Sequence, residues 1–253
     1  MLEPVVALAV SYPDGVRIPR HRHRTAQLIA AVSGVMTVTT RDGTFVVPPQ
    51  RGVWVPPLVE HRIRMTGEVA MRTVYVSRSR AKKLSARCCV VQVTPLLREL
   101  VLRAVEFPAR YRRGGREAKI AALIVDEIEH ASVAPLHLPL PVDARAQRVT
   151  RALAANPGDP RSFADLARAA GASSRTLARV FRRETGMSFR AWRQQLCLLR
   201  GLERLAAGES VLTIALELGY DSPSAFIAMF KRAFGVSPGR YFRERAPVIP
   251  STT

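Results

Sequence analysis

The chain has 253 residues, of which 47% are apolar and 23% charged, a composition typical of a globular protein with one to three domains and not of a disordered or fibrous chain. Its three cysteines have neither a disulfide framework nor zinc-ribbon spacing, and no apolar run reaches the roughly 20 residues of a membrane span. The first ten residues lack the basic start of a signal peptide. We therefore expect a cytoplasmic protein with no membrane partner.

The charge balance favours a polyanionic partner. Lys and Arg number 39 against 20 Asp and Glu, which gives a formal net charge of +19. Such an excess attracts nucleic acid at long range. All but four of the basic residues are arginines, however, a bias that genomic base composition also produces, and the excess is spread over both halves of the chain. Charge therefore suggests nucleic acid without indicating which half binds it.

The first elements along the chain are predicted to be short β-strands. Apolar runs at 28–32, 35–40, 45–47, 53–55 and 71–77 are separated by Gly, Pro and Asp-Gly breaks. Many short strands without a helical period between them predict a small barrel or sandwich over residues 1–82. After Thr94 the period becomes helical, which predicts two amphipathic helices at 95–105 and 116–131 within a linking and dimerisation segment, 83–133.

The second half of the chain is predicted to be helical. Three prolines prevent a helix at 134–141, which we interpret as a linker between domains. Beyond it, a helical domain at 142–247 has about seven helices, the longest at about 189–207, and is followed by a short tail at 248–253. The expected fold class is α+β, with an N-terminal cupin-like barrel, linking helices and an all-α C-terminal domain.

The helical half contains an internal duplication. Ala167 and Gly171 recur 48 residues later as Ala215 and Gly219. At an offset of 49, five more positions recur: Ser173, Leu177, Phe181, Gly186 and Ser188 align with Ser222, Phe226, Phe230, Gly235 and Ser237. Each copy has a short helix, a Gly for a left-handed turn, a Ser to cap the next helix, and an apolar triplet at i, i+3 and i+4. This pattern is typical of a helix-turn-helix unit.

The two copies differ on the face that points away from the core. In the first copy an apolar stripe turns Arg175, Arg179 and Arg182 outward on a helical wheel. Guanidinium groups on such a face can enter the major groove, where Arg donates two hydrogen bonds to guanine. In the second copy the outward positions are Ser224, Ala228 and Lys231, from which we expect weaker readout through thymine methyl groups or phosphates.

At these residues the chain resembles the AraC/XylS family of bacterial transcription regulators, over about 142 to 247. The second copy reads Ile214-Ala215-Leu216-Glu217-Leu218-Gly219-Tyr220-Asp221-Ser222, followed by Phe226, Phe230-Lys231, Phe234-Gly235 and Ser237-Pro238. The resemblance implies two helix-turn-helix units joined by a long helix, here 189–207, that read adjacent major-groove segments of double-stranded DNA.

The resemblance also implies the residues that contact DNA. Carried over by position, the base contacts would come from Arg175, Ala178 and Arg179 in the first unit and from Pro223, Ser224 and Ala228 in the second. Ala178 and Ala228 stand where some family members have long polar side chains. The rest of the expected DNA-binding set is Thr176, Arg182, Arg183, Lys231 and Arg232.

The N-terminal half contains candidate effector-binding residues. Gly15, His21, His23, Gln27 and Gly34 have the spacing Gly-x5-His-x-His-x3-Gln-x6-Gly, which resembles the first motif of the cupin barrel with Gln in place of Glu. A strand of period 2 would point His21, His23 and Gln27 to one face, and together with His61 from a later strand they can hold a divalent first-row metal ion. Trp54 completes the expected effector-binding set. The alternative is that these histidines line a pocket for an organic effector without a metal.

The expected function is a sequence-specific DNA-binding transcription regulator, an activator or a repressor, whose barrel senses a small molecule or a metal ion. The alternative is a metal-dependent cupin enzyme fused to a DNA-binding module, but no paired carboxylates, Ser-His-Asp order or Walker loop strengthen it. We therefore expect no catalysis, and no cofactor beyond the candidate metal ion. RNA polymerase is an expected partner, as is a second copy of the chain bound through the apolar stripes of the helices at 95–105 and 116–131, which include Leu97 and Leu100.

Overall fold

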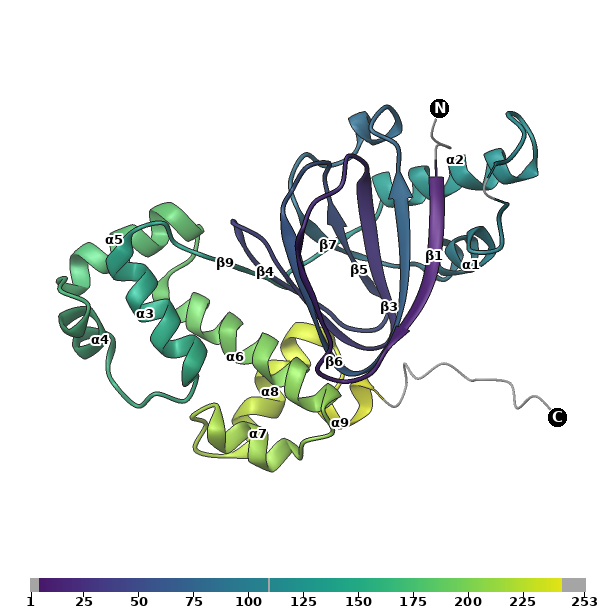
Figure 1. The fold of residues 1–253 in the computed structure, drawn as a ribbon. Coiled ribbons are helices and arrows are strands. Elements are labelled where there is room, and N and C mark those ends of the chain that lie inside the picture. The colour runs from purple at the N-terminus through teal and green to yellow at the C-terminus, as the bar shows by residue number, and fades with distance from the viewer. Residues whose placement is uncertain (1–4, 109, 243–253) are drawn as a thin grey trace. The chain divides into compact units, whose positions relative to one another are not determined.

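The computed structural model describes residues 5–108 and 110–242 (Figure 1). Among these residues there are two compact units, one of residues 5–41 and 45–137 and one of residues 42–44 and 138–242. The tail expected at 248–253, and positions 243–247 of the expected DNA-binding domain, lie outside the described residues. No helix in the described ranges has the length and hydropathy required to cross a membrane.

The first unit is built on an antiparallel sheet, as expected for the N-terminal half (Figure 1). Its strands are β1 (Val5–Tyr12), β2 (Arg17–His21), β3 (Ala26–Thr39), β4 (Gly43–Val47), β5 (Arg51–Val55), β6 (His61–Val76), β7 (Cys89–Gln92), β8 (Val133–Ala134) and β9 (His137–Pro139). They follow the order β1-β6-β3-β5-β7-β8, with β2 paired to β6 and β4 paired to β3. A short 3-10 helix, η1 (Arg80–Lys83), follows β6.

The strand β3 is longer than the sequence predicts. The runs expected as separate strands at 28–32 and 35–40 are halves of one strand, because the chain passes Gly34 without turning back. The pairing of β3 with β6 shifts register on both sides of Ser33, and Gly34 has a φ of 67°. A β-bulge of this kind accommodates an extra residue and bends the strand.

Two helices cover one face of this sheet. Helix α1 (Pro95–Ala104) and helix α2 (Arg116–Glu129) share a hydrophobic core with Leu28 and Val74 of the strands. Leu97 lies fully inside this core, so the expectation that it faces a second copy of the chain is wrong. Among the large apolar side chains of these helices, Leu96 and Leu123 are exposed instead.

The proline-rich segment expected as a linker is extended, as its prolines require, and it also joins the sheet. It contains β9 and the end of β8. The backbone N–H of Val46 donates to the carbonyl oxygen of Leu136 at 3.0 Å, and Leu136 is buried. The segment therefore belongs in part to the core of the first unit.

The second unit is helical and contains the expected duplication (Figure 1). In the described chain its helices are α3 (Ala144–Ala155), α4 (Phe163–Ala169), α5 (Ser174–Thr185), α6 (Phe189–Ala206), α7 (Val211–Glu217), α8 (Pro223–Phe234) and α9 (Pro238–Tyr241). Helices α4 and α5 form the first helix-turn-helix unit and α7 and α8 the second. The long helix α6 joins them, as the sequence predicts.

Candidate DNA-binding helices and effector site

Local residues explain where helix α5, the second helix of the first helix-turn-helix unit, begins and ends and which face it buries. Its N-cap Ser173 accepts a hydrogen bond from the backbone N–H of Thr176 at 3.2 Å, and Gly186 ends the helix with a φ of 71°. Leu177, Val180 and Phe181 are buried. Burial of this stripe fixes which side of α5 faces outward.

The outward side of α5 is basic. Arg175, Ala178, Arg179, Arg182 and Arg183 are all exposed, and Thr176 is half-buried. The side chains that the sequence assigned to the outer face therefore do lie there.

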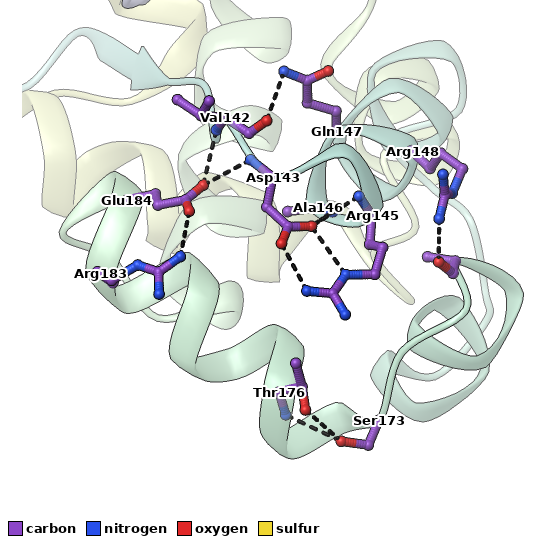
Figure 2. Close-up of polar contacts among 11 residues, drawn as sticks. Val142, Asp143, Arg145, Ala146, Gln147, Arg148, Ser173, Thr176, Arg183 and Glu184 are labelled. Atoms are coloured by element: carbon purple, nitrogen blue, oxygen red, sulfur yellow. Dashed lines mark hydrogen bonds and ion pairs between the residues drawn. The ribbon is translucent and has the colours of Figure 1, made fainter.

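A carboxylate that the sequence did not reveal holds the C-terminal end of α5. One oxygen of Glu184 accepts the backbone N–H groups of Val142 and Asp143, both at 2.9 Å, and its other oxygen accepts a guanidinium N–H of Arg183 at 2.6 Å (Figure 2). The hydrogen bond from Asp143 and the one from Arg183 lower the pKa of Glu184. An acidic residue at a helix C-terminus opposes the helix dipole, which was the only sequence signal of this role.

Helix α3 supports the same unit. Asp143 caps it by accepting the backbone N–H of Arg145 at 2.9 Å, and the hydrogen bonds from Arg145 hold the pKa of this carboxylate well below its usual range. Arg148 donates to the carbonyl oxygen of Ala170 at 2.6 Å and so caps the end of α4 (Figure 2). These contacts join α3, α4 and α5 into one body that carries the arginine face.

The second helix-turn-helix unit repeats this layout with a different surface. Phe226, Met229 and Phe230 of α8 are buried. Its outer positions Ser224, Ala228, Lys231 and Arg232 are exposed, and Pro223 is half-buried. The expectation that Ser222 caps α8 is wrong: its φ is −149°, against −76° at Ser173, and its side chain makes no cap hydrogen bond.

The loop after α3 packs against the second helix-turn-helix unit. A Cβ atom on Gly158 would lie 3.1 Å from the backbone nitrogen of Gly219 and closer still to the carbonyl oxygen of Glu217. Arg193 of α6 donates to the carbonyl oxygen of Asp159 in the same loop. Backbone therefore lies directly on backbone here, and this contact joins the first helix-turn-helix unit to the turn of the second one.

Three histidines of the sheet domain lie together. The ring centroids of His21 and His61 are 4.3 Å apart, those of His21 and His23 are 4.8 Å apart, and those of His23 and His61 are 5.6 Å apart. The sheet register is the cause, because His21 and His61 are cross-strand partners in β2 and β6. The expectation that His21, His23 and Gln27 share one strand is wrong, since β2 ends at His21 and β3 begins at Ala26.

Backbone carbonyls orient two of these imidazoles. Nδ1 of His21 lies 2.7 Å from the carbonyl oxygen of Pro19, and Nδ1 of His61 lies 3.0 Å from that of Val59. A carbonyl oxygen only accepts, so Nδ1 carries the proton and Nε2 keeps a free lone pair. Burial lowers the pKa of both His23 and His61, which favours neutral rings at pH 7.

Buried polar atoms in this cluster lack partners. Nε2 of His23 and Nε2 of His61 are buried and have no hydrogen-bond partner among the described residues. The same holds for Oε1 of Gln27, whose amide N–H donates to Oγ1 of Thr73 at 2.8 Å. Each buried polar atom without a partner costs about 1–3 kcal/mol. The cluster therefore has an unmet capacity to bind a ligand.

Gln27 lies on the same side of the sheet as this cluster, whereas Trp54 does not. Gln27 pairs with Tyr75 across β3 and β6, and the Tyr75 ring packs edge-on against His23 with centroids 5.2 Å apart. Trp54 pairs with Leu28, whose side chain points to the opposite face, and both belong to the core under α1 and α2. The structure thus places Trp54 in the core, away from the expected effector site.

The chain has two helix-turn-helix units, of which the first has an exposed arginine face, and a sheet domain with buried polar atoms that lack partners among the described residues. These features define a ligand-responsive DNA-binding regulator as the class of protein. Comparisons with known families agree. Residues 3–137 match the AraC-like ligand binding domain, and residues 166–244 match a helix-turn-helix domain.

Two relatives of this chain are named as HTH-type transcriptional regulators. The HTH-type transcriptional regulator NimR of Escherichia coli (strain K12) is 35% identical over 239 residues, which cover 94% of this chain and 87% of NimR. The HTH-type transcriptional regulator RipA of Corynebacterium glutamicum is 34% identical over 125 residues, or 46% of this chain and 37% of RipA. The crystal structure of ToxT from Vibrio cholerae O395 aligns with 97% of this chain and 99% of ToxT, at 12% identity and a TM-score of 0.42.

The chain belongs to the AraC family of helix-turn-helix transcription regulators, with an N-terminal ligand-binding domain and a C-terminal DNA-binding region. The alternative of a cupin enzyme fused to a DNA-binding module receives no support from these relatives, which are named as transcriptional regulators.

Proposed function

We propose that α5 reads base edges in the major groove and so provides most of the sequence specificity of this regulator. The observation that carries the proposal is the exposed arginine face of α5 above a fully buried apolar stripe. Arg175 and Arg179 can each donate two hydrogen bonds to O6 and N7 of guanine, with Ala178 between them close to the bases. Thr176 near the helix start, and Arg182 and Arg183 near its end, bind phosphates.

Helix α8 contributes a weaker contact in the adjacent groove segment. Pro223, Ser224 and Ala228 are short, so they suit apolar contact with thymine methyl groups rather than bidentate hydrogen bonds. Lys231 and Arg232 at its C-terminal end bind phosphates. Both helix-turn-helix units therefore fix the position of the protein along the DNA, whereas the first provides most of the discrimination between bases.

The proposal includes partners besides DNA. An effector binds in the sheet domain beside His21, His23, Gln27 and His61, and it acts by favouring one of two states that differ in DNA affinity. RNA polymerase is the partner at the promoter, and a second copy of the chain binds through the exposed side of α1 and α2. The protein acts in the cytoplasm, and it works by binding rather than by catalysis.

Arg179→Ala tests the base-reading role of α5. Duplex sites are first selected from a random-sequence pool with the full-length protein. On a selected site the affinity should fall about 5- to 150-fold, equivalent to about 1–3 kcal/mol, because a bidentate contact to one base pair is lost. Affinity for random duplex should change little. Arg182→Ala should instead lower the slope of log affinity against log salt concentration by about 1.

The matched control for this experiment is Arg80→Ala, which removes the same charge from the exposed 3-10 helix η1 of the sheet domain and should leave both affinities unchanged. An equal loss for Arg179→Ala on selected and on random duplex would contradict the base-reading role and assign Arg179 to phosphate.

A further inference from the structure

The histidine cluster has the donor set and spacing of a metal site. One ring nitrogen from each of His21, His23 and His61 lies within 4.8 Å of the others. The three side chains come from three segments, the end of β2, the connection to β3 and the start of β6. Structural histidines in a core satisfy both ring nitrogens, whereas here Nε2 of His23 and of His61 is buried without a partner among the described residues.

The surroundings of these rings match those of metal-ligating histidines. A ligating imidazole usually donates its other ring N–H to a backbone carbonyl or a carboxylate, which fixes the tautomer and ring orientation. His21 and His61 already make this hydrogen bond, to Pro19 and Val59. Their Nε2 lone pairs are therefore available without any change of tautomer.

We propose that His21, His23 and His61 together bind one divalent first-row transition metal ion, with Zn²⁺, Ni²⁺, Co²⁺ and Cu²⁺ as the class and Oε1 of Gln27 as a further ligand. Imidazole nitrogen suits these ions, whereas Mg²⁺ and Ca²⁺ require carboxylate or carbonyl oxygens, and the cluster has no carboxylate. Oε1 of Gln27 is buried and without a partner, on the side of the sheet where Tyr75 meets His23. This assignment rests on the proposed function, because it names the ligand class of the sensing domain.

Metal binding would also change the structure around the site. At a metal–nitrogen distance of about 2.1 Å and a tetrahedral angle, two ligating nitrogens are about 3.4 Å apart. The ring nitrogens of the cluster lie within 4.8 Å of one another, so an ion would draw the three imidazoles closer together. A ligand that binds one such arrangement better than the other shifts the equilibrium between them.

The test uses full-length protein from which metal has been removed with a chelator. Zn²⁺ is titrated against a competing indicator, and Co²⁺ is titrated while its visible d–d absorption reports coordination. Wild-type protein should bind one ion per chain. In His21→Asn and in His23→Asn the affinity should fall at least about 100-fold, since the loss of a ligand exceeds the usual effect of losing a supporting residue.

The control is His130→Asn, which removes the exposed histidine that follows α2, outside the cluster, and should bind as wild type does. Because His61 is fully buried, its replacement can impair folding, so the half-buried His21 and His23 provide the readout and circular dichroism confirms that both variants are folded. Wild-type protein that binds no stoichiometric ion, or variants that all bind equally well, would overturn the proposal. So would a cluster that binds only an organic compound.

Failure of this inference is distinguishable from failure of the proposed function. The metal titration uses no DNA, and the selection of duplex sites with Arg179→Ala needs no metal. A protein that selects specific sites but binds no ion retains the DNA-reading role and loses only the metal assignment. A protein that binds the ion through these histidines but selects no site retains the metal site and loses the DNA-reading role.

Discussion

Ser173 and Ser222 occupy the same position in the two helix-turn-helix units but make different contacts. Ser173 caps α5 through the backbone N–H of Thr176, and its hydroxyl also donates to Oγ1 of that residue at 2.9 Å. Ser222 precedes α8 with no cap hydrogen bond. The duplication aligns residue types, whereas the backbone angle at each site decides which hydroxyl reaches its helix.

This difference predicts unequal effects of the same substitution. Ser173→Ala should lower the free energy of unfolding by about 1 kcal/mol, the usual cost of removing an N-cap. Ser222→Ala serves as the internal control and should change the free energy of unfolding by only a few tenths of the effect of Ser173→Ala. Urea denaturation at neutral pH measures both, and equal losses would contradict the difference in capping.

Asp159 makes the loop after α3 sensitive to acid. Its carboxylate accepts hydrogen bonds from the guanidinium and the backbone N–H of Arg161, and these lower its pKa to about 2 from an ordinary value of 3.8. A carboxylate with a depressed pKa in the folded state stabilises that state above its unfolded pKa. The stabilisation is lost as the pH falls from about 4 towards 2.

Asp159→Asn should remove this contribution. At pH 7 we expect the free energy of unfolding to fall by about 1 kcal/mol, less than the pKa shift alone implies because the Arg161 partner is partly exposed to solvent. Between pH 5 and pH 2.5 the stability of the variant should decline less steeply than that of the wild type. If the free energies of unfolding of variant and wild type fall in parallel over this pH range, the Asp159 carboxylate is not the source of the acid sensitivity.

At the level of elements, the contact between the loop after α3 and the end of α7 fixes how the two helix-turn-helix units are spaced. Gly158 and Gly219 lie so close that no side chain fits between them. Arg200 of α6 adds a hydrogen bond to the carbonyl oxygen of Ala154 at 3.0 Å, near the end of α3. These contacts supplement the covalent connection through α6.

Gly158→Ala should therefore act on both stability and DNA binding. The new methyl group has to displace backbone atoms of α7 and its turn, a form of overpacking that costs about 1–3 kcal/mol. Because α5 and α8 would change their spacing, affinity for a selected two-unit site should also fall. Gly208→Ala is the control for lost stability without a clash: its Cβ meets no atom within 4 Å, but its φ of 82° strains any side chain, so it should lower stability and leave DNA affinity unchanged. Wild-type DNA affinity in Gly158→Ala would exclude a positioning role for this contact.

For the whole molecule, regulation requires that an event in the sheet domain change how the chain binds DNA. A second copy bound through α1 and α2 is our proposed route, because these helices belong to the sheet domain and still expose apolar surface. Leu96 is 51% and Leu123 is 43% exposed, whereas Leu97 is fully buried in the core of its own chain. We therefore propose that Leu96 and Leu123 lie in this interface and that Leu97 does not.

Leu123→Asp should convert a dimer into a monomer in sedimentation velocity, since a carboxylate in an apolar interface is desolvated without a partner. Leu97→Asp should instead unfold the domain. Leu212→Asp, at a leucine of α7 that is 55% exposed, is the control and should leave the oligomeric state unchanged. A wild-type protein that sediments as a monomer at all concentrations would refute the proposed interface.

The sequence alone determined the features that depend on short-range periodicity. The duplication, the buried stripe of α5 and its outward arginines follow from spacings of three and four residues, which a helix converts directly into faces. The resemblance to the AraC/XylS family depends on the same local pattern. The duplication and the family resemblance were both confirmed, and neither depends on how distant segments pack.

The tertiary structure decided everything that depends on register between distant segments. His21 and His61 meet because β2 pairs with β6, and Trp54 faces the core because it pairs with Leu28 rather than with Gln27. A shift of one residue in a strand would exchange its two faces, and local sequence does not specify that choice. Glu184 likewise gained its role from the N–H groups of Val142 and Asp143, about 40 residues earlier in the chain, which only folding brings within hydrogen-bond distance.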